Sequence, residues 1–143
     1  MNTSYNTDVV AWANEQARLI REGKFDQLDL EHIAEEIQDV GKSEQRELSS
    51  RMAVLLAHLL KWQHQPDRRT RSWTITLKNQ RARIALAIKV TPSLKNSLTD
   101  EDWKTEAWLD ALTQARKETG LDEFPEVCPW SMAEVLTEDW LPE

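Results

Sequence analysis

Imidazole and carboxylate side chains gather in the first half of the chain at spacings that could serve metal binding or acid–base catalysis. His32 and Glu36 are four residues apart, so they share one face of a helix, and Glu35 and Asp39 are close by. His58 borders the apolar stripe of the next helical stretch. If the two stretches pack antiparallel, carboxylates and imidazoles could converge inside a helical bundle, as in di-metal helical proteins.

The metal hypothesis for His32, Glu36 and His58 lacks the motif that such proteins usually carry. Di-metal bundles show Glu-x-x-His on paired helices, and this sequence contains none. His64 lies about 240° around the helix from His58, a poor position for sharing an ion. Solvated carboxylates and a hydrogen-bonded histidine at the margin of the core are the simpler interpretation. We therefore expect no metal and no cofactor.

Positive charge is concentrated in the middle of the chain. Residues 61–95 carry nine Lys and Arg against one Asp, a net charge of +8, whereas residues 1–60 and 96–143 carry −5 and −10. Basic side chains interleaved with tryptophan could bind phosphate groups or stack on bases. The candidate interaction residues are Arg68, Arg69, Arg71, Trp73 and Lys78.

Internal neutralisation competes with this interpretation. Both acidic flanks belong to the same small chain, so arginines of the basic segment could form ion pairs with them. We expect at least one of Arg68, Arg69 and Arg71 to be paired with a flanking Asp or Glu. Binding of nucleic acid or another polyanion is therefore an alternative that is not favoured, and no recognised nucleic-acid motif supports it.

Other kinds of catalytic site have less support. Cys128, the only cysteine, lies in an apolar stretch without a basic neighbour that would lower its pKa. No Gly-rich phosphate loop, G-x-S-x-G or zincin motif occurs. A single cysteine excludes an internal disulfide and is typical of a reducing compartment, so we expect a cytoplasmic protein. No stretch approaches 18 apolar residues, which predicts no membrane span.

Helical periodicity predicts the elements that position these residues. Apolar residues recur at intervals of three and four, and three glycines are few for a β-rich protein. Thr7 and either Ser97 or Thr99 are expected caps, and Gly41 is expected to end or bend a helix. The predicted helices cover residues 8–22, 29–41, 43–65, 71–89 and 99–119, with a short capping-box helix over 132–136.

The apolar stripes of these helices predict the core. Phe25, in the link after the first helix, is expected to reach that core. The second helix has a stripe of Leu30, Ile33, Ala34, Ile37 and Val40. The third helix carries a bundle seam of Leu48, Met52, Leu55, Leu59 and Trp62, all expected to be buried.

The fourth predicted helix is apolar on two sides. Trp73, Leu77, Ile84 and Ile88 lie on one side, and Ile75, Ala82 and Leu86 on roughly the opposite one. A helix of this kind is usually enclosed on both sides by the core. Its basic residues Arg71, Lys78 and Lys89 fall within about 20° of each other and form a row.

Several stretches of the chain resemble one known family. They are Leu30-Glu-His-Ile-Ala-Glu-Glu-Ile, His58-Leu-Leu-Lys-Trp-Gln-His-Gln-Pro, Arg71-Ser-Trp and Phe124-Pro-Glu-Val-Cys-Pro-Trp. The sequence is similar to domain-of-unknown-function family twenty-nine (DUF29), which is common in bacteria and especially in cyanobacteria. The resemblance covers about Tyr5 to Glu143 and is most specific over 58–73. It implies an all-helical fold and no particular activity.

We predict an all-α, compact, single-domain bundle over residues 1–143, with about five main helices and a short C-terminal one. The leading functional hypothesis is a non-catalytic module that binds a protein partner, because no catalytic constellation is present and the surface charge contrast is strong. The alternatives are nucleic-acid or polyanion binding through 61–95 and a metal-dependent enzyme using His32, Glu36 and His58.

Overall fold

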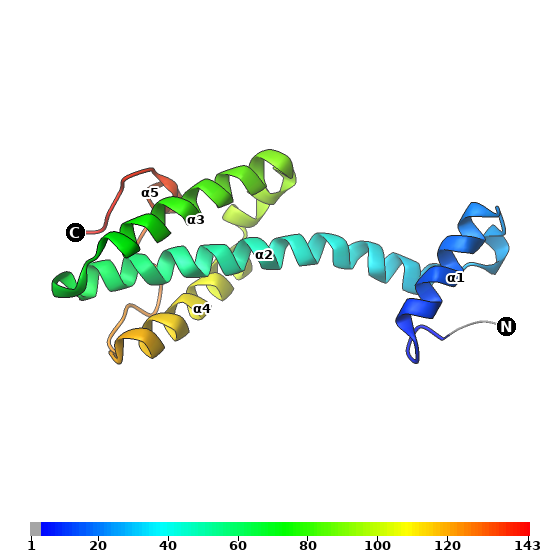
Figure 1. Cartoon of the computed structure of the whole chain (residues 1–143), viewed down its shortest axis with the longest axis horizontal. Coiled ribbons are helices and arrows are strands. Elements are labelled where there is room, and N and C mark those ends of the chain that lie inside the picture. The colour runs from blue at the N-terminus through cyan, green and yellow to red at the C-terminus, as the bar shows by residue number, and fades with distance from the viewer. Residues whose placement is uncertain (1–3) are drawn as a thin grey trace. The chain divides into compact units, whose positions relative to one another are not determined.

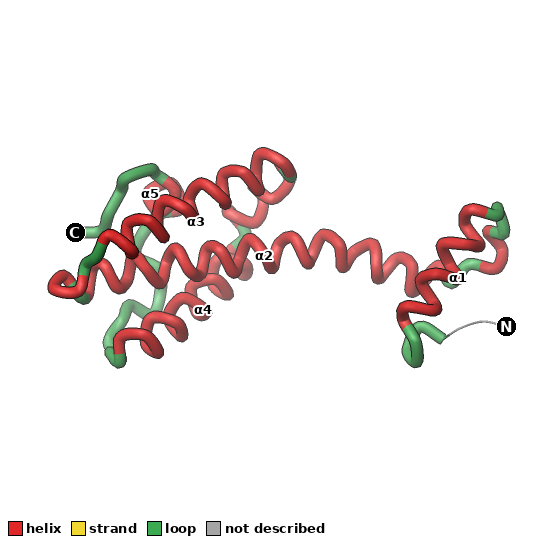
Figure 2. The backbone as a smooth tube through the Cα atoms, viewed as in Figure 1, coloured by secondary structure: helices red, strands yellow, loops and turns green. Residues whose placement is uncertain are grey.

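The computed structural model of the chain describes residues 4–143 and confirms the all-α prediction, since these residues contain helices and loops but no strand (Figure 2). The α-helices are α1 (Val9–Arg21), α2 (Leu30–His64), α3 (Arg71–Val90), α4 (Glu101–Thr119) and α5 (Met132–Leu136). Three 3-10 helices connect them: η1 (Phe25–Gln27), η2 (Pro66–Arg68) and η3 (Pro92–Thr99). No helix within residues 4–143 is long and apolar enough to cross a membrane.

The chain divides into two compact units, Met1–Ser43 and Glu44–Glu143. In the first unit Asp8, rather than the predicted Thr7, caps α1 by accepting a hydrogen bond from the Ala11 amide. Gly23 follows the helix at a φ of 74°, a left-handed conformation that favours glycine. Phe25 is 63% exposed, so its predicted place in the core is wrong.

The prediction of a helix end at Gly41 is wrong, because α2 continues through this residue as one helix of 35 residues. A glycine ends a helix readily when it adopts a positive φ, and the positive-φ glycines are Gly23 and Gly120. Glutamate, lysine, glutamine and arginine follow Gly41 and favour helix. Their propensity outweighs the cost of about 1 kcal/mol for one interior glycine.

The core of the second unit is built around the C-terminal half of α2. As predicted, Leu48, Met52, Leu55 and Leu59 are fully buried, and they pack with residues of α3, α4 and the C-terminal segment. Figure 1 shows α3 and α4 running alongside this half of α2. Trp62, also predicted to be buried, is only half-buried at the end of the seam.

α3 begins at the predicted Arg71, with Thr70 as its cap. Leu77 and Ile84 are buried on one side, as expected. The other side is not enclosed, since Ile75 and Leu86 are 55% and 59% exposed. The prediction of a helix buried on two sides is therefore wrong, because other helices cover α3 along one face alone.

The last two helices follow local capping signals. Asp100, and not the predicted Ser97 or Thr99, caps α4 by accepting from the Asp102 and Trp103 amides, and Gly120 ends this helix at a φ of 72°. For α5 the predicted capping box of Ser131 and Glu134 is present, with both reciprocal hydrogen bonds.

Candidate functional site on α3

The residues of the metal hypothesis make other bonds. In the first unit, His32 Nδ1 lies 2.7 Å from the Asp29 carboxylate, and the imidazole stacks on the Tyr5 ring. The Tyr5 hydroxyl donates to Glu36, and this bond, together with nearby negative charge, raises the pKa of Tyr5 to about 12. The bond to Asp29 raises the pKa of His32 above its ordinary value.

The His58 imidazole bonds to the backbone of its own helix. Its Nδ1 lies 2.9 Å from the Val54 carbonyl oxygen, and burial lowers the pKa of the imidazole. Residues 4–143 contain no group of three His, Cys, Asp or Glu side chains that could hold a metal ion. The antiparallel turn that would bring His58 to His32 and Glu36 depended on a helix end near residue 41, where α2 is instead continuous.

Cys128 is half-buried and packs against the core of the second unit. Its Sγ lies 3.5 Å from the Trp130 carbonyl oxygen, and burial raises the pKa of the thiol above its usual value. A thiol in such surroundings stays protonated at neutral pH and is a poor nucleophile.

The predicted neutralisation of the basic segment 61–95 is largely wrong. Among the basic residues of the described segment, only Lys61 forms the expected ion pair. Its Nζ lies 2.9 Å from Oε2 of Glu118 and 5.3 Å from the centre of the Trp73 ring. No other basic residue of this segment is within ion-pairing distance of a carboxylate in the described part of the chain. Most of the basic residues of 61–95 therefore have no carboxylate partner among residues 4–143.

The candidate interaction residues separate into two groups. Arg69 is held by the protein itself, since its Nε donates to the Trp62 carbonyl at 2.8 Å and its guanidinium lies 4.6 Å above the Trp62 ring. Trp73 is half-buried beneath Lys61. Arg68, Arg71 and Lys78 are exposed, as Arg69 is, but their side chains make no hydrogen bond or ion pair within residues 4–143.

A mixed basic and apolar face therefore runs along the outer side of α3. The predicted row of Arg71, Lys78 and Lys89 is exposed along the helix. Beside it lies an apolar stripe of Ile75, Ala82, Leu86 and Val90, also exposed. These residues recur at intervals of four and seven, which places them on one side of the helix. We call this surface, row and stripe together, the α3 face.

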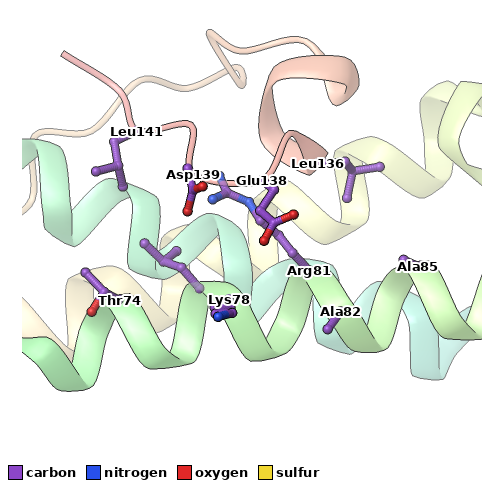
Figure 3. A pocket seen from close by; sticks show the side chains of 10 residues that line it. Thr74, Lys78, Arg81, Ala82, Ala85, Leu136, Glu138, Asp139 and Leu141 are labelled. Atoms are coloured by element: carbon purple, nitrogen blue, oxygen red, sulfur yellow. The ribbon is translucent and has the colours of Figure 1, made fainter.

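A cavity of about 320 Å³ opens next to the α3 face, between α3 and the C-terminal segment (Figure 3). Its lining residues from α3 are Thr74, Leu77, Lys78, Arg81, Ala82 and Ala85, and those from the C-terminal segment are Leu136, Glu138, Asp139 and Leu141. The lining thus combines apolar side chains with two cations from α3 and two carboxylates from the C-terminal segment.

Arg81 is the charged residue built into this cavity. It is 8% exposed, and it donates from Nε to the Val135 carbonyl at 2.9 Å and from Nη2 to the Trp140 carbonyl at 2.7 Å. Burial lowers the pKa of the guanidinium, and the charge of Asp139 opposes this effect. Sequence reasoning counted Arg81 within the basic segment without assigning it to a site. Its position in the buried stripe, between Leu77 and Ile84, was the available signal.

The profile of the domain of unknown function DUF29 matches residues 4–141, nearly the whole chain. The chain belongs to the DUF29 family. No curated protein and no solved structure matches it.

This membership confirms the family resemblance read from the sequence, and the match extends over both units of the DUF29 chain. Because the family has no assigned activity, the chemistry of this DUF29 domain has to be inferred from its own residues. Its α3 face can attract a partner that combines negative charge with apolar side chains. Its cavity can hold a small molecule that carries both charges.

Proposed function

We propose that this DUF29 domain is a non-catalytic protein-interaction module, and that its α3 face binds an acidic amphipathic helix of a partner protein. The observation that carries the proposal is the exposure of Ile75, Leu86 and Val90 beside a basic row that forms no ion pair with the described part of the chain. A partner helix would cover the apolar stripe with its own, as in helix-in-groove complexes, and place its carboxylates on the basic row. The single thiol suits a reducing, cytoplasmic setting.

The apolar stripe favours a protein over a nucleic acid. Phosphate backbones offer charge to lysine and arginine but nothing that would cover Ile75 and Leu86. Proteins that bind single strands stack bases on exposed aromatic rings. Both tryptophans of the basic segment, Trp62 and Trp73, instead lie half-buried beneath cations of the chain itself.

Binding of nucleic acid or another polyanion is the second candidate, and one observation favours it. Arg68, Arg71 and Lys78 are exposed and have no carboxylate partner in residues 4–143, contrary to the expected neutralisation. The metal-dependent alternative has less support, because His32, Glu36 and His58 each bond to another group of the protein.

The test is affinity capture from an extract of the source cells treated with nucleases. We compare the wild-type domain with the double variant Arg71→Glu/Lys89→Glu, which reverses two charges of the basic row. Arg46→Glu/Lys117→Glu is the matched control, since it makes the same change of charge at exposed positions outside α3. Circular dichroism checks that each variant is folded.

The proposal predicts that the wild type and the control retain one protein, identified by mass spectrometry, and that the α3 variant loses it. Ile75→Asp should also lose it, because it interrupts the apolar stripe. If the wild type captures a protein from an untreated extract but not from the nuclease-treated one, the result would favour the polyanion alternative. Equal retention by the α3 variant and the control would contradict docking on the α3 face.

A further inference from the structure

The cavity beside Arg81 has the construction of a ligand pocket. Its volume of about 320 Å³ lies at the lower end of the range for small-molecule sites, roughly 300–1,000 Å³. Leu77, Leu136 and Leu141 supply an apolar floor, and polar groups converge on it from two elements. Sites of this size and composition hold compact ligands with an apolar body and a few charged atoms.

Arg81 has capacity left for a ligand. A guanidinium carries five N–H groups, and Nε and Nη2 each donate to a backbone carbonyl. Within residues 4–143 Nη1 has no hydrogen-bond partner, and no carboxylate is within ion-pairing distance of this buried cation. The open N–H groups of Nη1 are accessible from the pocket, and a carboxylate brought by a ligand can bond to them in place of water.

The C-terminal segment adds negative charge to the lining of the pocket. Glu138 and Asp139 are exposed and line it, and Figure 3 shows their carboxyl groups on the side of the C-terminal segment that is turned to α3. Asp139 is held at a φ of 65°, in the left-handed region that a non-glycine residue rarely occupies. Together with Lys78 and Arg81, the lining has two charges of each sign.

We propose that this pocket binds a small zwitterion with an apolar body, namely an amino acid like leucine or a dipeptide of such residues. The carboxylate of the ligand bonds to Arg81, its ammonium group lies against Asp139 and Glu138, and its side chain covers the leucine floor. A plain anion meets two carboxylates in this pocket, and a plain cation meets Lys78 and Arg81. A zwitterion alone matches the charges of both signs in the lining.

The test uses L-leucine, leucyl-leucine and two compounds that each lack one charge, 4-methylpentanoate and 3-methylbutylamine. Each is titrated into the full chain with ¹³C-labelled methyl groups, and binding is followed by NMR. The expected result is a saturable shift of the methyl signals of Ala82, Ala85 and Leu136 with leucine or its dipeptide. The two singly charged compounds should bind at least about tenfold more weakly, since each loses one ion pair.

Variants of Glu138 and Asp139 test ligand binding without the loss of stability that is expected when Arg81 is replaced. Arg81 also holds the C-terminal segment, so its replacement is expected to destabilise the domain. Glu138→Gln/Asp139→Asn changes exposed residues instead, and asparagine tolerates the left-handed conformation. It should weaken leucine binding about tenfold. The control, Asp122→Asn/Glu123→Gln, neutralises an exposed acidic pair outside the pocket and should leave binding unchanged.

Three outcomes would overturn the zwitterion pocket. They are the absence of a saturable methyl shift with both zwitterions, equal binding of leucine and 4-methylpentanoate, and equal weakening by the control variant. The α3 face shares Lys78 and Ala82 with the pocket lining, but Arg71, Ile75 and Lys89, whose variants test the α3 face, lie outside it, so the two tests can fail separately.

Discussion

The two halves of α2 carry the same kind of apolar stripe and meet different surroundings. In the N-terminal half, Leu30, Ile37 and Val40 are each 67% exposed. In the C-terminal half, Leu48 and Leu55 are fully buried by α3, α4 and the C-terminal segment. Amphipathic spacing therefore gives a helix an apolar stripe that other segments can bury. Whether the stripe is buried depends on which distant segments of the chain fold against it.

The largest expected difference between the halves is in stability. Leu55→Ala should lower the free energy of unfolding by about 2–5 kcal/mol, because it removes a fully buried side chain and leaves a cavity. Ile37→Ala should change it by less than about 0.5 kcal/mol, as is usual for exposed positions. Urea denaturation followed by circular dichroism gives both values. Similar losses for the two variants would show that the N-terminal stripe is covered in solution.

Trp62 lies at the end of the buried half of α2, and its replacement should cost less stability than that of a fully buried tryptophan. Trp62→Ala should cost about 2 kcal/mol, less than the 3–5 kcal/mol typical of a fully buried tryptophan, because the ring is half-buried and one face is covered by Arg69. The same denaturation experiment measures it. Arg69→Met removes the charge above the ring and should cost about 1 kcal/mol or less. A loss above 4 kcal/mol for Trp62→Ala would restore the original prediction of a buried ring.

Gly41, near the junction of the halves, tests whether the helix is continuous there. Gly41→Ala should stabilise the protein by about 0.5–1 kcal/mol, because alanine favours helix and an added Cβ has open space around it. Gly120→Ala should destabilise by about 1 kcal/mol, since Gly120 has a positive φ. Thermal unfolding of the two variants measures this difference. A destabilising Gly41→Ala would contradict a regular helix at residue 41.

The smallest expected effect is an opposite response of the two regions to pH. The bond to Asp29 raises the pKa of His32 above 6.5, whereas burial lowers the pKa of His58 below 6.5. The stability that His32 contributes is then present below pH 6.5 and is lost as pH rises through its folded pKa. That of His58 is present above pH 6.5 and is lost as pH falls through its folded pKa.

Proton NMR of the imidazole rings between pH 4 and 9 measures these two histidines directly. Asp29→Asn should return the pKa of His32 towards its ordinary value and leave that of His58 unchanged. The same titration midpoint for both rings would contradict the bonds assigned to Asp29 and Val54.

Local signals predicted most of the helices. Pro66 and Thr91-Pro92 separate α2, α3 and the chain that follows, and the capping box at Ser131 starts α5 where it was expected. Caps were less predictable, because neighbouring residues such as Thr99 and Asp100 can each accept from the first amides, and backbone geometry selects between them. Gly41 had the same ambiguity, since its residue type alone does not set its φ.

The candidate site was predicted in part. Arg71, Lys78 and Lys89 could be placed in one row from their spacing, and the structure exposes them. Arg69 and Trp73 belong to the same basic, tryptophan-containing segment, yet each makes a cation–π contact within the protein. The turn at η2 brings Arg69 over the Trp62 ring, and the start of α3 brings Trp73 under Lys61. Arg81 was missed as a pocket residue, because its acceptors lie more than fifty positions further along the chain.

The sequence by itself determined the helical class, the stripes along each helix and the basic middle of the chain. These properties follow from residue types at intervals of three and four, and short-range geometry is enough to express them. Only the tertiary structure decided that one stripe of α2 is buried and the other exposed, that α3 is covered on a single side, and that Arg81 is part of a pocket. Burial and long-range hydrogen bonds need a second segment at close range, and no local pattern specifies which segment that is.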